Sequence, residues 1–251
     1  MLSTIRYLRD MAIWANDMNG RFKIFLKSRF PFLAPAWRRI RYFSPAGIST
    51  QQRFTRIFRR NTWGDNDSLS GTGSSLAQTE MVRHVLPSLI RELNCRSVLD
   101  IPCGDFFWMK AVEMDVDYIG GDIVDELISN NQRLYGGDGR RFMHLDLLQD
   151  TLPDVDLILC RDCLVHFSYE HIVQALGNIK RSGGRYLLTT TFVERDGNED
   201  IPTGGWRPIN LQRPPFNFPT PVRLIDEQCP DAGYRDKHLG LWRTVDIPIF
   251  L

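Results

Sequence analysis

The residues of this chain that are best able to do chemistry each follow a short apolar run. In order along the chain they are Asp100, Gly104, Asp122, Asp146, Asp162 and His166. Short runs rich in Val, Ile and Leu are typical of parallel strands that are buried on both faces. Since the carboxyl ends of parallel strands meet at one edge of a sheet, where such folds bind ligands, we expect these groups to lie together.

The first run, residues 97–99, leads into Asp100 and a turn built on Gly104. This is the strand–turn–helix pattern of a nucleotide-binding crossover, in which glycine lets a ligand approach the backbone and the next helix offers free N–H groups to an anion. A dinucleotide loop needs two further glycines, whereas Pro102 and Phe106 stand on either side of Gly104. The turn therefore disfavours a pyrophosphate and suits S-adenosylmethionine, which has no phosphate.

Asp122 lies at the carboxyl end of the second apolar run, residues 118–123. An acid about 20 residues past the glycine turn is well placed to hold a ribose, because two carboxylate oxygens match two adjacent hydroxyl groups. The alternative is that Asp122 caps the helix that follows. We predict the ribose-binding role.

Residues 100–106 (DIPCGDF) and 161–166 (RDCLVH) resemble a bacterial family of class I S-adenosylmethionine-dependent methyltransferases, from about Phe54 to the C-terminus. The resemblance implies a Rossmann-like α/β fold, with a seven-stranded, mostly parallel sheet of order 3-2-1-4-5-7-6 and helices on both faces. It also implies S-adenosylmethionine as the cofactor, with Asp146 and Leu147 beside the adenine. The cofactor-binding residues expected at the strand ends are Asp100, Pro102, Cys103, Gly104, Asp105, Asp122, Ile123, Asp146, Leu147 and Arg161.

Asp162 and His166 follow the fourth run, residues 156–160, and should face the methyl group of the cofactor. His166 can take a proton, with an unperturbed pKa of about 6.5, and Asp162 could orient it or bind substrate. We predict that both are catalytic. The alternative for His166 is a helix-start histidine bonded to a backbone carbonyl. Cys160 and Cys163 form a C-x-x-C pair, but no second pair stands at metal-ligand spacing, so no metal site is expected.

Length and composition predict one α/β domain, residues 51–251, after a basic arm, residues 1–50. Five scattered cysteines and the lack of a long apolar run indicate a reducing, cytoplasmic location. Residues 1–45 hold nine basic and two acidic residues, a net charge of +7 in a chain of total charge +1, with aromatic residues interleaved. Such an arm could lie on the anionic inner face of a membrane, or pack on its own domain or a second subunit.

Two loops are expected to complete the site. The first lies within residues 51–79 and could fold over the cofactor as a lid, although a solvated linker is the alternative. Its expected cofactor contacts are Trp63, Ser70, Gly71 and Gly73. The second loop, residues 193–221, should wall the acceptor site, since aromatic faces with Arg and Asn donors suit a sugar or another polar ring. Those side chains equally suit surface packing; the expected substrate contacts are Trp206, Arg207 and Asn210.

Local signals predict two helices and the last strand. Apolar residues recur at three- and four-residue intervals from Val82 to Leu93, and Pro87 should kink or split this helix. Ser168 should cap a second helix. The run from Leu239 onward should close the sheet as an antiparallel strand.

Together these features predict a methyltransferase that transfers the methyl group of S-adenosylmethionine to a sugar hydroxyl of a cell-surface glycan or its precursor. Three alternatives share the same cofactor residues. They are a methyltransferase acting on a small polar metabolite or a protein, one acting on nucleic acid, which we favour less, and a binding module without catalysis. The oligomeric state is not indicated by the sequence.

Overall fold

A computed structural model describes residues 47–64, 67–137 and 139–250. Residues Ser49–Leu251 form one compact unit. The basic arm, residues 1–45, lies outside the described residues, so the prediction made for it stays a prediction. In the described part of the chain, no helix is both long and apolar enough to cross a membrane.

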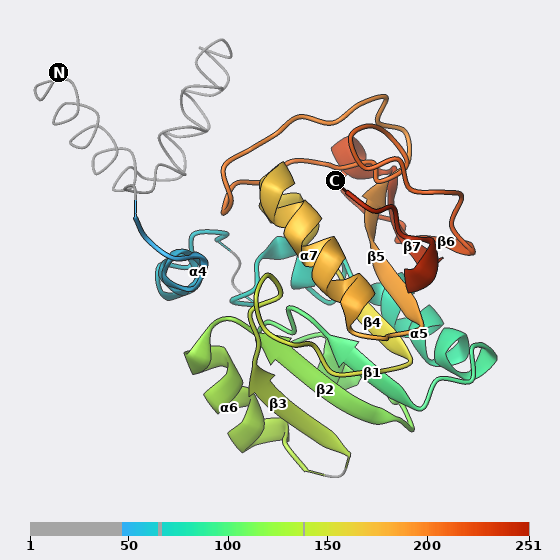
Figure 1. Cartoon of the computed structure of the whole chain (residues 1–251). Helices are drawn as coiled ribbons and strands as arrows, with labels where there is room; N and C mark the ends of the chain where they lie inside the picture. Colours follow the sequence, from blue (N-terminus) through green and yellow to red (C-terminus); the bar gives the residue numbers. More distant parts are fainter. Residues whose placement is uncertain (1–46, 65–66, 138, 251) are drawn as a thin grey trace, which may run out of the picture. The chain divides into compact units, whose positions relative to one another are not determined.

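The unit is built on a seven-stranded sheet of order β3-β2-β1-β4-β5-β7-β6 (Figure 1). The neighbours from β3 to β5 pair in parallel, whereas β7 runs antiparallel to both β5 and β6. The predicted strand order is therefore confirmed. The strands are β1 Ser97–Asp100, β2 Asp117–Asp122, β3 Arg140–His144, β4 Leu157–Cys160, β5 Tyr186–Phe192, β6 Arg223–Asp226 and β7 Lys237–Arg243.

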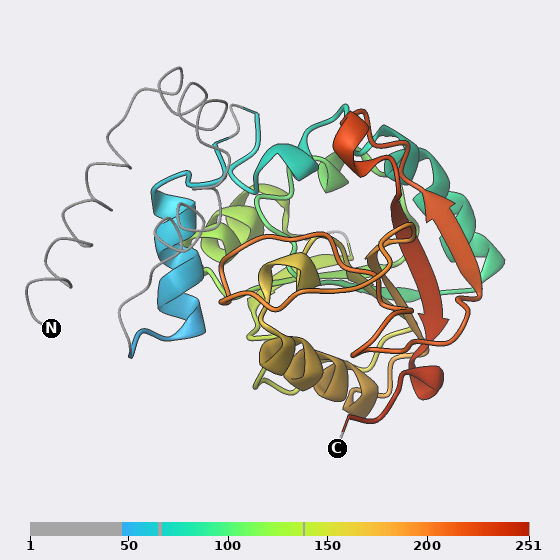
Figure 2. The same cartoon turned by 90° about the horizontal axis from the view of Figure 1, so that it is seen from above.

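Helices cover both faces of the sheet. The α-helices are α4 Thr50–Arg59, α5 Glu80–Glu92, α6 Asp125–Tyr135 and α7 Tyr169–Arg181. Figure 2 shows α5 and α7 on opposite sides of the strands. Short 3₁₀ turns form at Thr72–Ser74, Met109–Ala111, Leu164–His166, Ala232–Tyr234 and Thr244–Asp246.

The apolar residues of the central strands β1 and β4 are buried on both faces of the sheet. Val98 packs in the cluster that contains the apolar side of α5, whereas its neighbour Leu99 packs in the cluster that contains α7. In β4, Leu157 packs in the cluster that contains α5, and Ile158 packs in the cluster that contains α7. All four side chains are fully buried, and each contributes roughly 1.5–3 kcal/mol by leaving water.

The two predicted helices form, with one difference. Ser168 caps α7, its hydroxyl accepting a hydrogen bond from the backbone N–H of His171, as predicted. Pro87 lies inside α5, which continues as one helix from Glu80 to Glu92, so the predicted split does not occur.

The helix expected directly after Gly104 is absent. Between β1 and β2 the chain forms only the 3₁₀ turn Met109–Ala111. Phe106 adopts a left-handed backbone with a φ of 57°, which a right-handed helix cannot include. Asp105 accepts a hydrogen bond from the N–H of Phe107 at 3.3 Å. The Phe106 ring packs against Phe142 at a centroid distance of 5.0 Å. Buried aromatic rings therefore fill the space under the glycine turn.

Candidate functional site

The glycine turn and Asp122 form one hydrogen-bonded unit at the carboxyl edge of the sheet. Gly104 donates its N–H to Asp122 Oδ2 at 3.1 Å, and Val124 donates its N–H to Oδ1 at 2.9 Å. Asn131 of α6 donates its side-chain amide to the Gly104 carbonyl at 2.8 Å. Gly104 has a φ of 55°, in the left-handed region that favours glycine. The ends of β1 and β2 are thus joined at one point.

Asp100 and Asp122 are both buried carboxyls, but they face different partners. Burial raises the pKa of Asp122 to about 6, against the lowering effect of its backbone hydrogen bonds. Burial raises the pKa of Asp100 to about 7, and Tyr118 of β2 donates its hydroxyl to this carboxyl at 2.6 Å. Asp100 therefore ties β1 to β2 inside the sheet, which differs from the cofactor contact predicted for it.

The loop that holds Ser68–Ser70 lies directly on the glycine turn. Asp105 accepts hydrogen bonds from the Ser68 hydroxyl at 3.0 Å and from the Leu69 N–H at 2.8 Å. Its own N–H donates to the Ser70 hydroxyl at 3.0 Å. A Cβ at Gly104 would collide with that same hydroxyl. Asp105 therefore holds the loop, whereas the sequence predicted that it contacts the cofactor.

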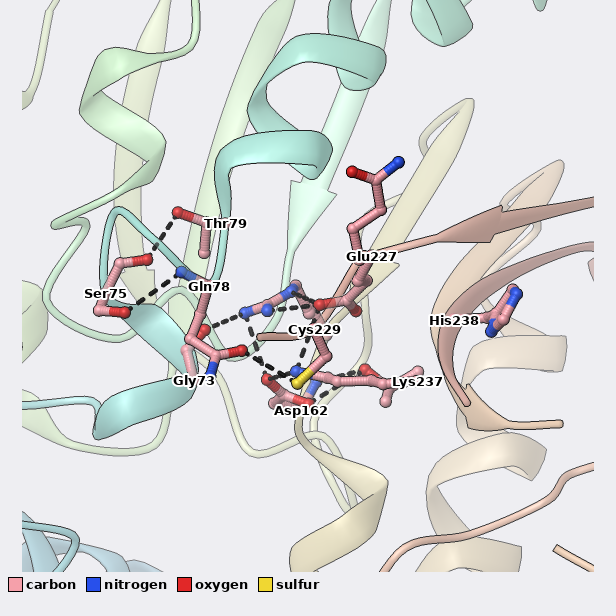
Figure 3. Close-up of polar contacts among 12 residues, drawn as sticks. Gly73, Ser75, Gln78, Thr79, Asp162, Glu227, Cys229, Lys237 and His238 are labelled. Atoms are coloured by element: carbon pink, nitrogen blue, oxygen red, sulfur yellow. Dashed lines mark hydrogen bonds and ion pairs between the residues drawn. The ribbon is translucent and has the colours of Figure 1, made fainter. Parts of the chain in front are cut away.

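A buried ion cluster anchors the same loop further along (Figure 3). Arg161 donates to the Gly73 carbonyl at 2.7 Å and to Glu227 at 2.6 Å. Lys237 lies 2.6 Å from Asp162 Oδ2 and 3.2 Å from Glu227 Oε2. The side chains of Arg161, Glu227 and Lys237 are at most 7% exposed. Arg161, predicted to bind the cofactor, thus acts on the loop.

Asp162 is held as a carboxylate by this cluster. Although burial opposes its ionisation, Lys237 and Arg161 lower the pKa of Asp162 to about 2. Its backbone is left-handed, with a φ of 51°, and its N–H donates to the Thr190 hydroxyl at 2.8 Å. At neutral pH it is a carboxylate, and its low pKa makes it a weak base. The described contacts include no hydrogen bond from Asp162 to His166, so the predicted orienting role is not seen.

His166 presents a free base at the end of the turn Leu164–His166. Its Nδ1 lies 2.7 Å from the Gly205 carbonyl. A carbonyl only accepts, so Nδ1 carries the hydrogen and Nε2 keeps its lone pair. Burial lowers the pKa of His166 to about 4, well below the value of about 6.5 expected from sequence. The ring of Trp63 lies against the imidazole, with centroids 4.6 Å apart and planes 31° apart.

The remaining cofactor residues predicted from the sequence lie around this edge. Ile123 is half-buried and Leu147 is buried. Asp146 accepts from the Leu148 N–H and from Gln149, both at 2.9 Å. Pro102 follows a cis peptide bond, Gly71 packs on Trp63, and burial raises the pKa of the Cys103 thiol.

The long loop after β5 uses two predicted substrate residues for its own structure. Arg207 is 1% exposed and donates to the carbonyls of Leu164 and Phe167 at 2.9 and 2.8 Å. Asn210 is 3% exposed and donates to the Arg195 carbonyl at 2.9 Å. Both side chains are therefore buried and bonded to backbone carbonyls, and the substrate contacts predicted for them stay a prediction. Trp206 remains half-buried, with its ring 4.9 Å from that of Tyr234.

Sequence reasoning missed Glu227, Lys237 and Asn131. The local signal for Glu227 and Lys237 was a charged residue next to an apolar run, which is common on protein surfaces, and Asn131 is an uncharged polar residue inside α6. Among the described residues, no group of three or more His, Cys, Asp or Glu side chains could hold a metal ion.

Comparison with known proteins identifies the fold. No protein-family model and no curated protein matches the chain. Human N-acetylserotonin methyltransferase, solved in complex with SAM, is 17% identical over 73% of this chain and 59% of its own, with a TM-score of 0.50. PH0226 protein from Pyrococcus horikoshii OT3 is 16% identical over 78% of this chain and 99% of its own, with a TM-score of 0.50. The chain thus has the Rossmann-like fold of class I methyltransferases, and it spans less than two thirds of the human enzyme.

Proposed function

We propose that this protein is an S-adenosylmethionine-dependent methyltransferase. The observation that carries this is the pairing of Gly104 with Asp122 at a turn that has no helix after it. A dinucleotide site uses the N-terminus of that helix to bind pyrophosphate, and here the chain forms only the turn Met109–Ala111. A carboxylate suited to a ribose is kept, while the phosphate-binding element is missing.

The residues present fit this cofactor. The Asp122 carboxylate, with each oxygen engaged by one backbone N–H, retains lone pairs for the two ribose hydroxyls. Ile123 and Leu147 supply apolar surface for an adenine, and Asp146 lies beside Leu147. The methionine end would lie near Gly104, under the loop that carries Ser70, Gly71 and Gly73.

We infer that the acceptor is a hydroxyl group and that His166 takes its proton. The cofactor, when bound, supplies a methyl group on a sulfonium, which needs little activation. The chain must therefore position the acceptor and accept a proton as its oxygen attacks. The imidazole of His166 is neutral, and its Nε2 carries no hydrogen. The hydrogen bond from Nδ1 to the Gly205 carbonyl sets the direction in which Nε2 points. Trp63 limits the ring to one orientation.

The acceptor we propose is a sugar of a cell-surface glycan or of its precursor. Trp206 offers a half-buried aromatic face in the loop after β5, and the basic arm suits an anionic surface. Methylated envelope sugars, measured in cells with and without this chain, test the proposal directly. If cells without this chain instead lack a methylated nucleic acid, protein or small metabolite, the glycan is not the acceptor. The proposal that the protein is a methyltransferase would still hold. Cofactor binding without any methylated product would indicate a binding module.

Asp122→Ala should weaken S-adenosylmethionine binding tenfold or more. The wild type is expected to bind with a Kd of about 1 µM, which is roughly −8 kcal/mol, and loss of a carboxylate that accepts hydroxyl hydrogen bonds costs about 1.5–3 kcal/mol. Isothermal titration calorimetry measures this. Asp117→Ala is the matched control, because Asp117 is an exposed residue at the opposite end of β2 and its loss removes the same charge. Wild-type affinity in Asp122→Ala, or tight binding of NAD, would contradict the proposed site.

Binding of S-adenosylmethionine should also weaken as the pH falls through about 6. Burial raises the pKa of Asp122 to about 6, so its hydrogen-accepting carboxylate form is present above that pH and is lost below it. Titrations at pH 7.5 and pH 5 would show the difference. Equal affinity at both pH values would mean that the carboxylate form is not needed.

The basic arm is proposed to hold the protein against an anionic membrane. Each cation near such a surface contributes about 1 kcal/mol, and the attraction decays over a Debye length of about 10 Å in 0.1 M salt. Deleting residues 1–45 should release the protein from anionic vesicles in a sedimentation assay while calorimetry shows unchanged cofactor affinity. An intact protein that ignores vesicles at low salt would contradict this role.

A further inference from the structure

Helix α4 places an arginine on the loop whose backbone bonds the proposed base. The Cδ of Arg53 lies 2.8 Å from where a Cβ on Gly204 would stand, so its aliphatic stem rests on this glycine. The next residue, Gly205, provides the carbonyl that binds His166 Nδ1. Phe54, the neighbour of Arg53 on the helix, packs on Trp63 with ring centroids 6.4 Å apart. Arg53 and its neighbour Phe54 therefore both contact residues next to His166.

Helix α4 is itself fixed in place from the other side. Gln51 donates to Asp125 at 3.0 Å, and Arg59 binds Glu126 at 2.7 Å, both at the start of α6. Asp125 begins the helix that follows the Asp122 segment. Helix α4 thus contacts the start of α6 through Gln51 and Arg59, and it contacts Gly204, next to the carbonyl that binds His166, through Arg53.

The charge of Arg53 has no counter-ion in the described part of the chain. Arg53 and Arg56 form no ion pair among the described residues, in contrast to Arg59 on the same helix. Burial and the nearby charge of Arg56 together lower the pKa of Arg53. The same positive charge acts on His171, whose Nδ1 lies 2.7 Å from the Thr203 hydroxyl. A half-buried guanidinium that faces another cation is costly unless an anion binds there.

We propose that the acceptor carries a phosphate group that binds Arg53, with Arg56 in support, and so places a neighbouring hydroxyl at His166. The guanidinium fork matches two oxygens of a phosphate, and such charge-assisted pairs fix geometry as well as adding affinity. This inference rests on the proposed function and narrows its acceptor to a phosphorylated sugar. A sugar precursor linked through phosphate has this chemistry.

The test uses the full chain and inorganic phosphate as the probe. The arginine Nε–H and histidine side-chain resonances are followed by NMR during a phosphate titration, with sodium chloride at matched ionic strength as a control. The wild type should show saturable shifts for Arg53 and His166 with phosphate and none with chloride. Equal responses to both salts would overturn the proposal, because they indicate screening alone.

Substitutions on one helix separate a binding site from bulk charge. Arg53→Gln should weaken phosphate binding, read at His166, about tenfold or more, and Arg53→Lys should weaken it less because the charge is kept while the fork is lost. Arg60→Gln removes the same charge from the exposed C-cap residue of α4 and should leave binding unchanged. If Arg53→Gln and Arg60→Gln have equal effects, there is no specific site and the proposal fails. Amide spectra report whether each variant is folded.

Two further measurements are made. The first distinguishes a phosphate on the acceptor from a membrane headgroup, and the second tests the proposed function independently of this inference. Binding to phosphatidylglycerol vesicles should be unchanged in Arg53→Gln; a loss there would assign Arg53 to membrane headgroups and overturn its role toward the acceptor. S-adenosylmethionine binding is measured by calorimetry on the same samples. Cofactor binding without an Arg53-dependent phosphate response defeats this inference alone. An Arg53-dependent phosphate response without cofactor binding defeats the proposed function and leaves an anion-binding site.

Discussion

Replacing His166 by alanine should lower turnover by about 10²–10⁴-fold and leave S-adenosylmethionine affinity unchanged. His166 is the proposed acceptor of the substrate proton, and its Nε2 keeps a lone pair because Nδ1 is bonded to the Gly205 carbonyl at 2.7 Å. The ring contributes no contact to Asp122 or Gly104, where the cofactor is proposed to bind. Steady-state rates on an identified acceptor, together with calorimetry, measure both quantities.

The pH profile provides a second measure of the same role. Burial lowers the pKa of His166 to about 4, so the neutral base is present above pH 4 and is lost only below it. At saturating cofactor, kcat should therefore stay level when the pH falls through 6.5, where an unperturbed histidine would protonate. Saturation matters because Asp122 titrates near 6 and would otherwise reduce the rate through binding.

His84→Ala is the matched control, since His84 is an exposed histidine on α5, away from the sheet edge. Its turnover should equal that of the wild type. A folded His166→Ala variant that works within a few-fold of wild type would mean that positioning of the acceptor suffices. A variant that loses cofactor affinity and stability together with rate would make His166 a structural residue.

Replacing Glu227 by glutamine should reduce the free energy of unfolding by about 3–5 kcal/mol. Glu227 is fully buried, and its Oε2 accepts from Arg161 at 2.6 Å and lies 3.2 Å from Lys237 Nζ. Without this carboxylate, two buried cations share Asp162 alone. Urea denaturation followed by circular dichroism measures the loss, which should appear as a lower midpoint with an unchanged slope.

Glu126→Gln is the control for this change. Glu126 pairs with Arg59 on the surface, where the two side chains are 39% and 65% exposed, and such pairs contribute about 0–1 kcal/mol. Replacing both Arg161 and Glu227 by methionine should cost less than the sum of the two single changes, since it removes opposite charges together. A loss below about 1 kcal/mol in Glu227→Gln would show that the Glu227 carboxylate is not needed to offset the buried charges of Arg161 and Lys237.

The sequence by itself predicted the strands and the sheet edge at which the proposed site lies. Apolar runs such as residues 157–160 and the glycine turn at Gly104 are local patterns that can be read from the chain, whereas the strand order was implied by the family resemblance and is confirmed by the structure. Asp122 is predicted to bind ribose from a local pattern as well, because it is an acid at the carboxyl end of an apolar run. Ser168 was recognised as a cap because an N-cap depends on only the next three residues.

The tertiary structure alone decided what the polar side chains bond. Arg207 and Asn210 look like ligand donors in sequence, yet in the folded chain both bond backbone carbonyls. Asp162 meets Lys237, 75 residues away, only because β7 returns antiparallel beside β5. The pKa of a group depends on burial and on neighbours of this distant kind. Neither can be read from spacing along the chain, whereas an apolar strand is defined by its own residues.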